Sequence, residues 1–166
     1  MPMPKNLPRD AVRDVMKTPV GELTLVASAA GLHVVTWDRD ELDAVPRDAK
    51  HPVIVATKRE LSEYFAGERK TFDVPLAPLG TPFQLRAWRE LSKIPYGKTI
   101  PYVEQARRVG DPKRARAVGG ANGRNPLAIV VPCHRVIAKD GGLGGFGGGL
   151  ANKRLLLDLE RGAAAG

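Results

Sequence analysis

The sequence predicts a two-domain fold, in which an N-terminal α/β domain precedes a C-terminal domain that is mainly helical. The first half contains short β-rich runs that are joined by glycine-containing turns and followed by one helical segment. The second half contains several segments with apolar residues at helical spacing. Prolines at positions 75, 78 and 82 surround Gly80, which is a composition typical of a linker. We therefore place the domains at residues 1–80 and 81–166.

The N-terminal domain is expected to contain an antiparallel sheet and one helix. Three β-rich runs predict strands, at residues 12–16, 23–27 and 32–37. The polar stretch 38–51 shows no periodicity and is expected to be a loop. Apolar residues at compatible spacing predict a helix over residues 53–65 that stops at Gly67. Residues 72–76 form either a further strand or an extended crossover.

The C-terminal domain is predicted to begin with a helix at residues 83–94, with Thr81 as its N-cap. Two shorter helices are expected next, at residues 102–109 and 112–121, with Gly110 in the tight turn between them. Such a pair is a helix-turn-helix, and its second helix carries several basic side chains. This combination favours nucleic-acid binding, and a plain solvated basic helix is the alternative.

The positive charge of the protein is confined to its second half. The net charge is +8. Residues 1–83 carry 11 Lys and Arg against 12 Asp and Glu, whereas residues 84–166 carry 15 against 6. General basicity that served solubility would not be confined to one half. The distribution therefore indicates a polyanionic partner, most simply a nucleic acid.

Cys133 is the only cysteine in 166 residues, so it has no disulfide partner within the chain. A lone cysteine is often a small buried apolar residue. Here a histidine follows it directly, and an apolar run at residues 127–131, which we expect to be a strand, gives way to a loop at this point. The glycine-rich segment 141–149 then allows another molecule to approach the backbone closely. These features favour a reactive thiol.

Composition also bears on location and cofactors. No apolar run approaches the roughly 20 residues that a membrane span needs, and the first residues lack the apolar core of a signal peptide. A single free thiol fits a reducing compartment, so we expect a cytoplasmic protein with no membrane partner. With one cysteine and only three histidines, we expect no metal and no other cofactor.

Six motifs follow one another with intact spacing over the second half of the chain. They are TPFQ at 81–84, IPYG at 94–97, RAVGGA at 116–121, NP at 125–126, PCHRVI at 132–137 and GGL at 148–150. Together they resemble the signature of the O6-alkylguanine-DNA alkyltransferases, and the similarity continues to Leu159-Glu160. The resemblance covers about half of the chain, and the N-terminal half shares only a general α/β pattern.

The resemblance implies a ribonuclease H-like N-terminal domain and a winged-helix-like C-terminal domain. It further implies DNA repair by a single-turnover transfer of an alkyl group to Cys133 from O6 of guanine, and less efficiently from O4 of thymine. The transfer would inactivate the protein irreversibly. The implied partner is double-stranded DNA that contains O6-alkylguanine, bound by a monomer, with cooperative binding left open. No cofactor is implied.

Five residues match the catalytic positions of this family: Cys133, His134, Glu160, Asn125 and Tyr102. The nucleophile must be a thiolate, because a neutral thiol attacks an alkyl carbon poorly. Adjacent side chains of extended backbone point to opposite faces, so a water molecule is expected to link Cys133 to His134. The resemblance implies such a bridge, and it implies that Glu160 orients His134. By resemblance, Asn125 hydrogen-bonds near the cysteine, and Tyr102 crowds the target phosphate and protonates the departing guanine.

The resemblance also assigns residues to the base pocket and to DNA. The pocket residues are Val136, Phe146 and Gly147. Phe146 stands where the family usually has a tyrosine, so it can stack on a purine but cannot donate a hydroxyl hydrogen bond. Arg116 would fill the gap that remains when the target nucleotide rotates out of the duplex. The DNA-binding positions are Tyr102, Val103, Asp111, Arg116 and Lys139.

Two other functions compete with alkyl transfer at this point. The first is a non-catalytic module that recognises alkyl damage in DNA, but relatives of that kind replace the cysteine, commonly with tryptophan, and this chain keeps Cys133. The second is a cysteine hydrolase that uses Cys133, His134 and Glu160 as a triad. The adjacency of the first two residues and the basic helix weigh against it.

Overall fold

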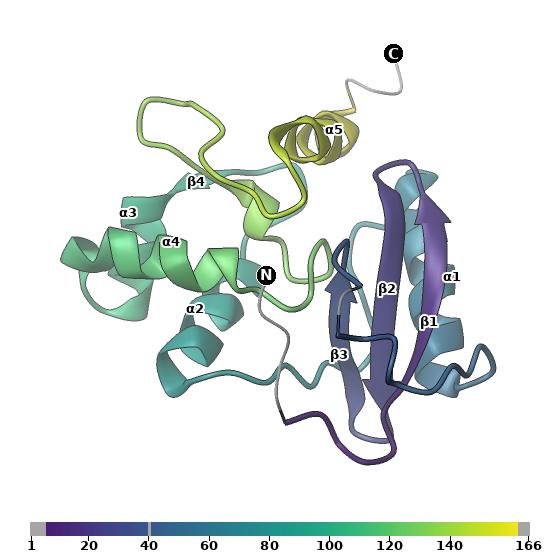
Figure 1. Ribbon diagram of the computed structural model, residues 1–166. Helices are drawn as coiled ribbons and strands as arrows, with labels where there is room; N and C mark the ends of the chain where they lie inside the picture. The colour runs from purple at the N-terminus through teal and green to yellow at the C-terminus, as the bar shows by residue number, and fades with distance from the viewer. Residues whose placement is uncertain (1–5, 40, 163–166) are drawn as a thin grey trace. The chain divides into compact units, whose positions relative to one another are not determined.

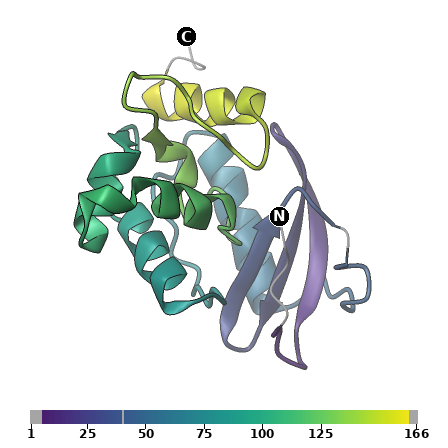
Figure 2. The same cartoon turned by 60° about the vertical axis from the view of Figure 1, so that its left-hand side comes forward.

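The computed structural model describes residues 6–39 and 41–162, and these divide into two compact units (Figures 1 and 2). The first unit contains the described residues up to Leu79 together with Pro126–Val130. The second unit contains Gly80–Asn125 and the described residues from Val131 onward. The chain therefore changes unit next to the proline-rich stretch and returns briefly to the first unit just before Cys133.

The first unit is built on a three-stranded antiparallel sheet with the order β1-β2-β3 (Figure 1). The strands are β1 (Val12–Thr18), β2 (Gly21–Ser28) and β3 (Gly31–Thr36), which confirms the three predicted strands. Gly31 begins β3 with φ of +133°, and a Cβ atom there would lie 2.7 Å from the carbonyl oxygen of Pro75. Only glycine meets both conditions at this turn.

Helix α1 (Pro52–Phe65) packs against the sheet and confirms the predicted helix. The side chain of His51 caps it by accepting a hydrogen bond from the N–H of Val53. Its buried face includes Ile54, Leu61 and Tyr64, which lie at helical spacing. The core of the unit therefore forms between this face and the apolar side chains of β2 and β3.

Two extended segments run parallel to β3, each joined to it by one bridge, at Leu76 and at Leu127. Residues 72–76 are thus an extended crossover. The predicted strand at residues 127–131 is wrong, because pairing stops after Leu127. Ile129 has φ of +72° and Val130 donates its N–H to the carbonyl of Ala128 at 2.8 Å, which turns the chain away from the sheet.

Three α-helices pack together in the second unit: α2 (Pro82–Ser92), α3 (Tyr102–Val109) and α4 (Ala115–Gly123). Thr81 forms a complete capping box at the start of α2, as its predicted N-cap role requires. Trp88 of α2 is buried, and its indole Nε1 donates to the carbonyl of Ala121 at 2.9 Å. This bond fixes α2 against α4.

The predicted helix at residues 112–121 begins differently in the structure. Its first residues form the 3-10 helix η1 (Pro112–Arg114), and α4 follows directly. Arg114 has φ of −94° and ψ of 23°, which lies outside the α region and separates the two helices. Asp111 caps η1 by accepting the N–H of Lys113 at 2.9 Å.

The remainder of the second unit contains short elements and one longer helix. Strands β4 (Ile100–Pro101) and β5 (Val136–Ile137) pair in parallel, and the 3-10 helix η2 (Cys133–Arg135) precedes β5. Helix α5 (Leu150–Arg161) follows the glycine-rich loop. Among the helices of the described ranges, none is both long and apolar enough to cross a membrane.

Candidate active site

Cys133 lines a cavity of about 370 Å³ in the second unit. The cavity lies among α3, α4, η2 and the glycine-rich loop, and its lining residues are Tyr102, Gly119, Asn122, Gly123, Cys133, Gly145, Phe146 and Gly147. Half of these residues are glycines, so backbone forms much of the wall. The volume lies at the lower end of the range for small-molecule pockets, which suits one group of the size of a nucleobase.

A tight turn, stabilised by Asn125, positions the thiol of Cys133. The side-chain Nδ2 of Asn125 donates to the carbonyl of Val131 at 2.8 Å, and the same side chain hydrogen-bonds to the thiol. The expected extended backbone at Cys133 and His134 is wrong. The chain has already turned at Ile129, and the N–H of Arg135 donates to the carbonyl of Pro132 at 3.0 Å, which closes a 3-10 turn.

The environment of the thiol disfavours its charged form at rest. Burial raises the pKa of Cys133 above its ordinary value, whereas the hydrogen bond from Asn125 and the positive charge of Lys153 act to lower this pKa. The net direction is upward, so the thiol is protonated at neutral pH. Its reaction therefore needs a base that removes the proton.

Glu160 of α5 lies between His134 and Arg135, and all three side chains are buried. His134 Nε2 is 2.6 Å from one carboxylate oxygen, and Arg135 reaches both oxygens, at 2.7 and 3.0 Å. Burial acts to raise the pKa of Glu160, but the hydrogen bonds from His134 and Arg135 outweigh it and hold that pKa far below its ordinary value. Glu160 is therefore ionised and can only accept hydrogen bonds.

The ionised carboxylate fixes the tautomer of His134. Since Glu160 can only accept, Nε2 of His134 must donate, and Nδ1 carries a lone pair. Burial lowers the pKa of His134, so the imidazole is neutral at neutral pH. Nδ1 is buried and hydrogen-bonds to no group in the described part of the chain, the sulfur of Cys133 included. His134 is thus a neutral base whose accepting nitrogen is uncommitted.

Lys153 connects the glycine-rich loop to β5. Its side chain is fully buried, and Nζ donates to the carbonyl of Val136 at 2.7 Å and to that of Gly145 at 3.3 Å. Burial lowers the pKa of Lys153, and the proximity of Cys133 acts to raise it. The ammonium therefore stabilises the position of the loop and also favours the thiolate form of Cys133.

Tyr102 begins α3 and lines the cavity. Burial raises the pKa of Tyr102, and the proximity of Cys133 raises it further, whereas a hydrogen bond with the backbone of Gly145 acts to lower it. The phenol therefore keeps its proton at neutral pH. A protonated hydroxyl in the cavity wall can donate to a ligand.

The predicted site residues fall into two groups in the structure. Phe146 and Gly147 line the cavity together with Cys133 and Tyr102. Val136 does not belong to the lining, because it is fully buried in β5 and its carbonyl accepts the hydrogen bond from Lys153.

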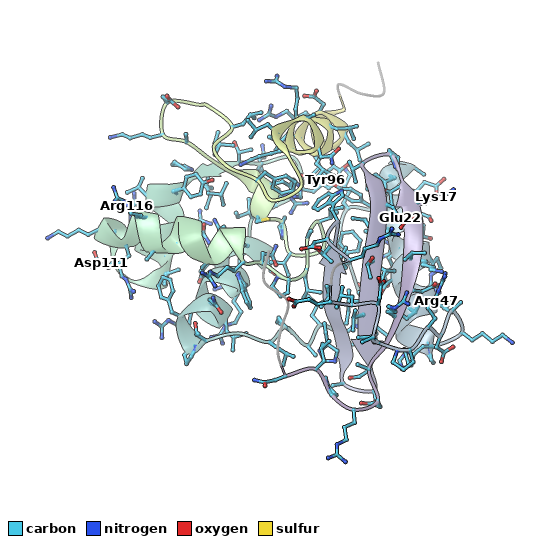
Figure 3. All side chains as sticks on the ribbon, viewed as in Figure 1. Lys17, Glu22, Arg47, Tyr96, Asp111 and Arg116 are labelled. Carbon is cyan, nitrogen blue, oxygen red and sulfur yellow. The ribbon has the colours of Figure 1, made fainter. Side chains whose placement is uncertain are left out.

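The predicted DNA-binding residues lie on several elements. Val103 is half-buried on α3, and Asp111 caps η1. Arg116 is exposed near the start of α4, and Figure 3 shows it beside Asp111 at one end of that helix. Lys139 is exposed on the segment that follows β5, away from the helix-turn-helix in the sequence.

Sequence reasoning assigned no role to Lys153 or Arg135, or to the amide pair that joins α3 to α4. Gln105 and Asn122 exchange two buried hydrogen bonds, at 2.9 and 2.7 Å. A signal for Lys153 was available, because it lies on the apolar face of α5 at helical spacing from Leu156 and Glu160. Charged residues on an apolar stripe are paired when buried.

Comparison with known proteins identifies the family of the chain. Residues 11–78 match the family model of the 6-O-methylguanine DNA methyltransferase, ribonuclease-like domain. Residues 82–162 match the family model of the 6-O-methylguanine DNA methyltransferase, DNA binding domain. The chain belongs to the 6-O-methylguanine DNA methyltransferase family. The expected family and the expected two-domain fold class are therefore confirmed.

Relatives of the family are similar over nearly their whole length. A methylated-DNA--protein-cysteine methyltransferase of Methanosarcina acetivorans is 44% identical over 149 residues, which is 88% of this chain and 96% of that protein. The crystal structure of the Mycobacterium tuberculosis O6-methylguanine methyltransferase matches with a TM-score of 0.82 and 42% identity, over 91% of this chain and 93% of that one. A structure of the mycobacterial protein in complex with DNA also has a TM-score of 0.82, with 44% identity over 89% and 91% of the two chains.

Proposed function

We propose that this protein repairs DNA by one transfer of an alkyl group to the sulfur of Cys133, from O6 of guanine and, less efficiently, from O4 of thymine. The observation that carries the proposal is the placement of the only thiol in a base-sized cavity, beside a neutral histidine whose Nδ1 can accept a proton. The transferases of the family to which the chain belongs act on methylated DNA, as their names state.

The substrate must enter the cavity as a single base. A duplex is too wide for a cavity of about 370 Å³, so the alkylated nucleotide has to rotate out of the helix. The helix-turn-helix of α3 and α4 lies beside the cavity, since Tyr102, Asn122 and Gly123 belong to both. Arg116, which is exposed near the start of α4, would occupy the gap in the duplex.

The chemistry conserves protons and electrons. A water molecule between the thiol and Nδ1 carries the proton of Cys133 to His134, and the ionised Glu160 stabilises the imidazolium that forms. The thiolate attacks the alkyl carbon, the carbon–O6 bond breaks, and its electron pair stays with the guanine. Tyr102 donates its proton to the guanine. The phenolate then regains a proton from solvent, and the imidazolium of His134 releases the proton of the thiol to solvent. The products are an S-alkylcysteine and an unmodified guanine.

The reaction occurs once per molecule. The product is a thioether, which a second thiolate would have to cleave, and Cys133 is the only cysteine in the chain. Because a thiol is needed for the single turnover, the reducing environment of the cytoplasm suits the protein.

The two competing functions have weaker support. A hydrolase triad needs a hydrogen bond between its nucleophile and its base. His134 Nδ1 makes no such bond with Cys133. A module that only binds DNA would not need an ionised Glu160 that fixes the tautomer of a buried histidine.

The test is intact-protein mass spectrometry after incubation with a short duplex that contains O6-methylguanine. We expect the mass to rise by one methylene group per protein, on Cys133, and to rise no further with excess DNA. Cys133→Ser and an unmodified duplex are the controls, and neither should give the gain. Unchanged mass together with retained DNA binding would replace alkyl transfer by damage recognition alone.

A further inference from the structure

A second groove lies in the C-terminal unit, between α2 and α3, and has a volume of about 240 Å³. Its lining residues are Arg86, Arg89, Glu90, Lys93, Arg108 and Val109. It shares no residue with the cavity that contains Cys133. Nothing in the alkyl-transfer chemistry uses it, so its strong positive charge needs a separate explanation.

The cations of the groove are only partly neutralised by protein carboxylates. Lys93 pairs with Glu90 at 2.9 Å, and Arg108 pairs with Glu104 at 3.2 Å. Arg86 and Arg89 form no salt bridge with any carboxylate in the described part of the chain. The groove therefore presents two unpaired guanidinium groups beside two paired cations.

The positive charge of the groove is continuous with that of the helix-turn-helix. The guanidinium of Arg114 lies 4.2 Å from the ring centroid of Phe83, and the guanidinium of Arg86 lies 5.9 Å from the same centroid. Arg114 immediately precedes α4, whereas Arg86 lines the groove. Both guanidinium groups therefore lie within 6 Å of the centroid of one ring, which connects the groove to the start of α4.

We propose that the groove between α2 and α3 binds the phosphodiester backbone of the DNA outside the target nucleotide. This inference rests on the proposed function, because it extends the same DNA complex. Arg86 and Arg89 of α2, together with Lys93 at its C-cap, follow one face over about 10 Å of helix axis. Phosphates on one DNA strand recur about every 3.4 Å along the duplex axis, so the row matches a few successive phosphates. The guanidinium fork also suits phosphate oxygens, which it can bind through two N–H groups.

The test compares two double variants that each remove two positive charges. Arg86→Gln with Arg89→Gln alters the groove. Arg9→Gln with Arg59→Gln removes two exposed arginines of the N-terminal unit that form no ion pair within residues 6–39 and 41–162. Binding of an undamaged duplex is measured at several salt concentrations for both variants and for the unaltered protein. Each lost phosphate contact lowers the slope of log affinity against log salt by about 0.9.

We expect the magnitude of this slope to fall by up to about 2 in the groove variant and to stay unchanged in the control variant. Alkylation of Cys133 by iodoacetamide should proceed at the unaltered rate in both variants, which shows that the environment of the thiol is intact. Equal slopes in the two variants would show that the groove does not bind DNA. The groove would then be a candidate site for an acidic protein instead.

The same measurements separate this proposal from the proposed function. If the unaltered protein binds DNA with the expected loss of slope in the groove variant but acquires no alkyl group, the transfer chemistry fails and the groove site stands. If alkyl transfer proceeds and the slopes are equal, only the groove site fails. If the unaltered protein does not bind DNA, both proposals fall.

Discussion

Arg135 binds both carboxylate oxygens of Glu160 through two nitrogens of its guanidinium group, at 2.7 and 3.0 Å. Its third nitrogen donates to the carbonyl of Ile94 at 2.7 Å, so the guanidinium is satisfied although the side chain is buried. The carboxylate that it keeps ionised is the one that fixes the tautomer of His134. Arg135 is the neighbour of His134 in the sequence, but it acts on His134 through Glu160, which lies 25 residues further along the chain on α5.

Replacing Arg135 with Met should destabilise the protein and slow alkyl transfer together. Glu160 would lose both guanidinium hydrogen bonds and stay buried beside His134, with a long hydrogen bond from the N–H of Gly97 at 3.4 Å. Breaking a buried ion pair costs about 3–5 kcal/mol of unfolding free energy. Urea unfolding measures this loss, and single-turnover transfer measures the rate. Arg135→Lys keeps the positive charge but not the forked guanidinium group. Its stability and its transfer rate should therefore lie between those of Arg135→Met and the unaltered protein.

The control for this prediction is Arg154→Met, which removes an exposed arginine of α5. An exposed substitution of this kind changes stability by no more than about 0.5 kcal/mol. If Arg135→Met also stayed within that range, the ion pair with Glu160 would have no structural role.

Replacing Lys153 with Met should raise the pKa of Cys133 further. The ammonium group lowers this pKa in the unaltered protein, so without it the thiolate form requires a higher pH. The rate at which a small electrophile such as iodoacetamide alkylates Cys133 should therefore rise at a higher pH than in the unaltered protein. Lys139→Met, which removes an exposed lysine, should leave the profile in place. Coincident profiles for all three proteins would exclude an effect of Lys153 on the thiol.

The sequence was sufficient to predict the elements whose signals are local. The strands of the sheet, α1 and α3 follow from periodicity, and Thr81 was recognisable as an N-cap because its partner lies three residues away. Tyr102, Cys133 and Phe146, which the family signature singled out, line one cavity. Their signals are residue types at fixed spacing, which a single sequence displays.

The features that were predicted incorrectly or missed depend on tertiary contacts. An apolar run such as residues 127–131 has the composition of a strand, but Ile129 adopts a left-handed conformation that the surrounding contacts impose. The partners of Glu160 and Lys153 come from distant positions, and side-chain identity does not show which oxygen meets which nitrogen. The roles of Arg135 and Lys153 therefore appear only once α5 is placed against η2 and β5.

Replacing Gly144 with Ala should displace the glycine-rich loop and slow transfer to Cys133. Gly144 has φ of +68°, and a Cβ atom there would lie 2.8 Å from the hydroxyl oxygen of Tyr102. The left-handed conformation alone costs a residue with a Cβ atom about 1–2 kcal/mol. If this free-energy cost applies to the loop conformation from which Cys133 reacts, the single-turnover rate falls about tenfold.

Gly142→Ala is the matched control in the same loop. Its Cβ atom would lie 3.1 Å from the carboxylate end of the exposed Asp140 side chain, which can move aside, and at an ordinary contact distance of 3.9 Å from Cβ of Ala138. We expect the rate of Gly142→Ala to stay near that of the unaltered protein. Equal slowing by both substitutions would mean that general stiffening of the loop, rather than the contact with Tyr102, limits transfer.

Acidification should remove a part of the stability that Asp14 supplies. Asp14 is buried on β1, where burial raises its pKa but hydrogen bonds from Lys58 and Arg47 outweigh this and lower the pKa to about 2 (Figure 3 labels Arg47). The unfolded chain titrates near the ordinary value of about 3.9. The contribution is therefore complete above about pH 4 and is lost as the pH falls toward 2. Urea unfolding at a series of pH values should show a shallower acid loss for Asp14→Asn than for the unaltered protein, whereas Asp43→Asn, at an exposed position, should keep the original slope. Identical slopes for Asp14→Asn and the unaltered protein would show that the two cations do not hold this carboxylate in its ionised form.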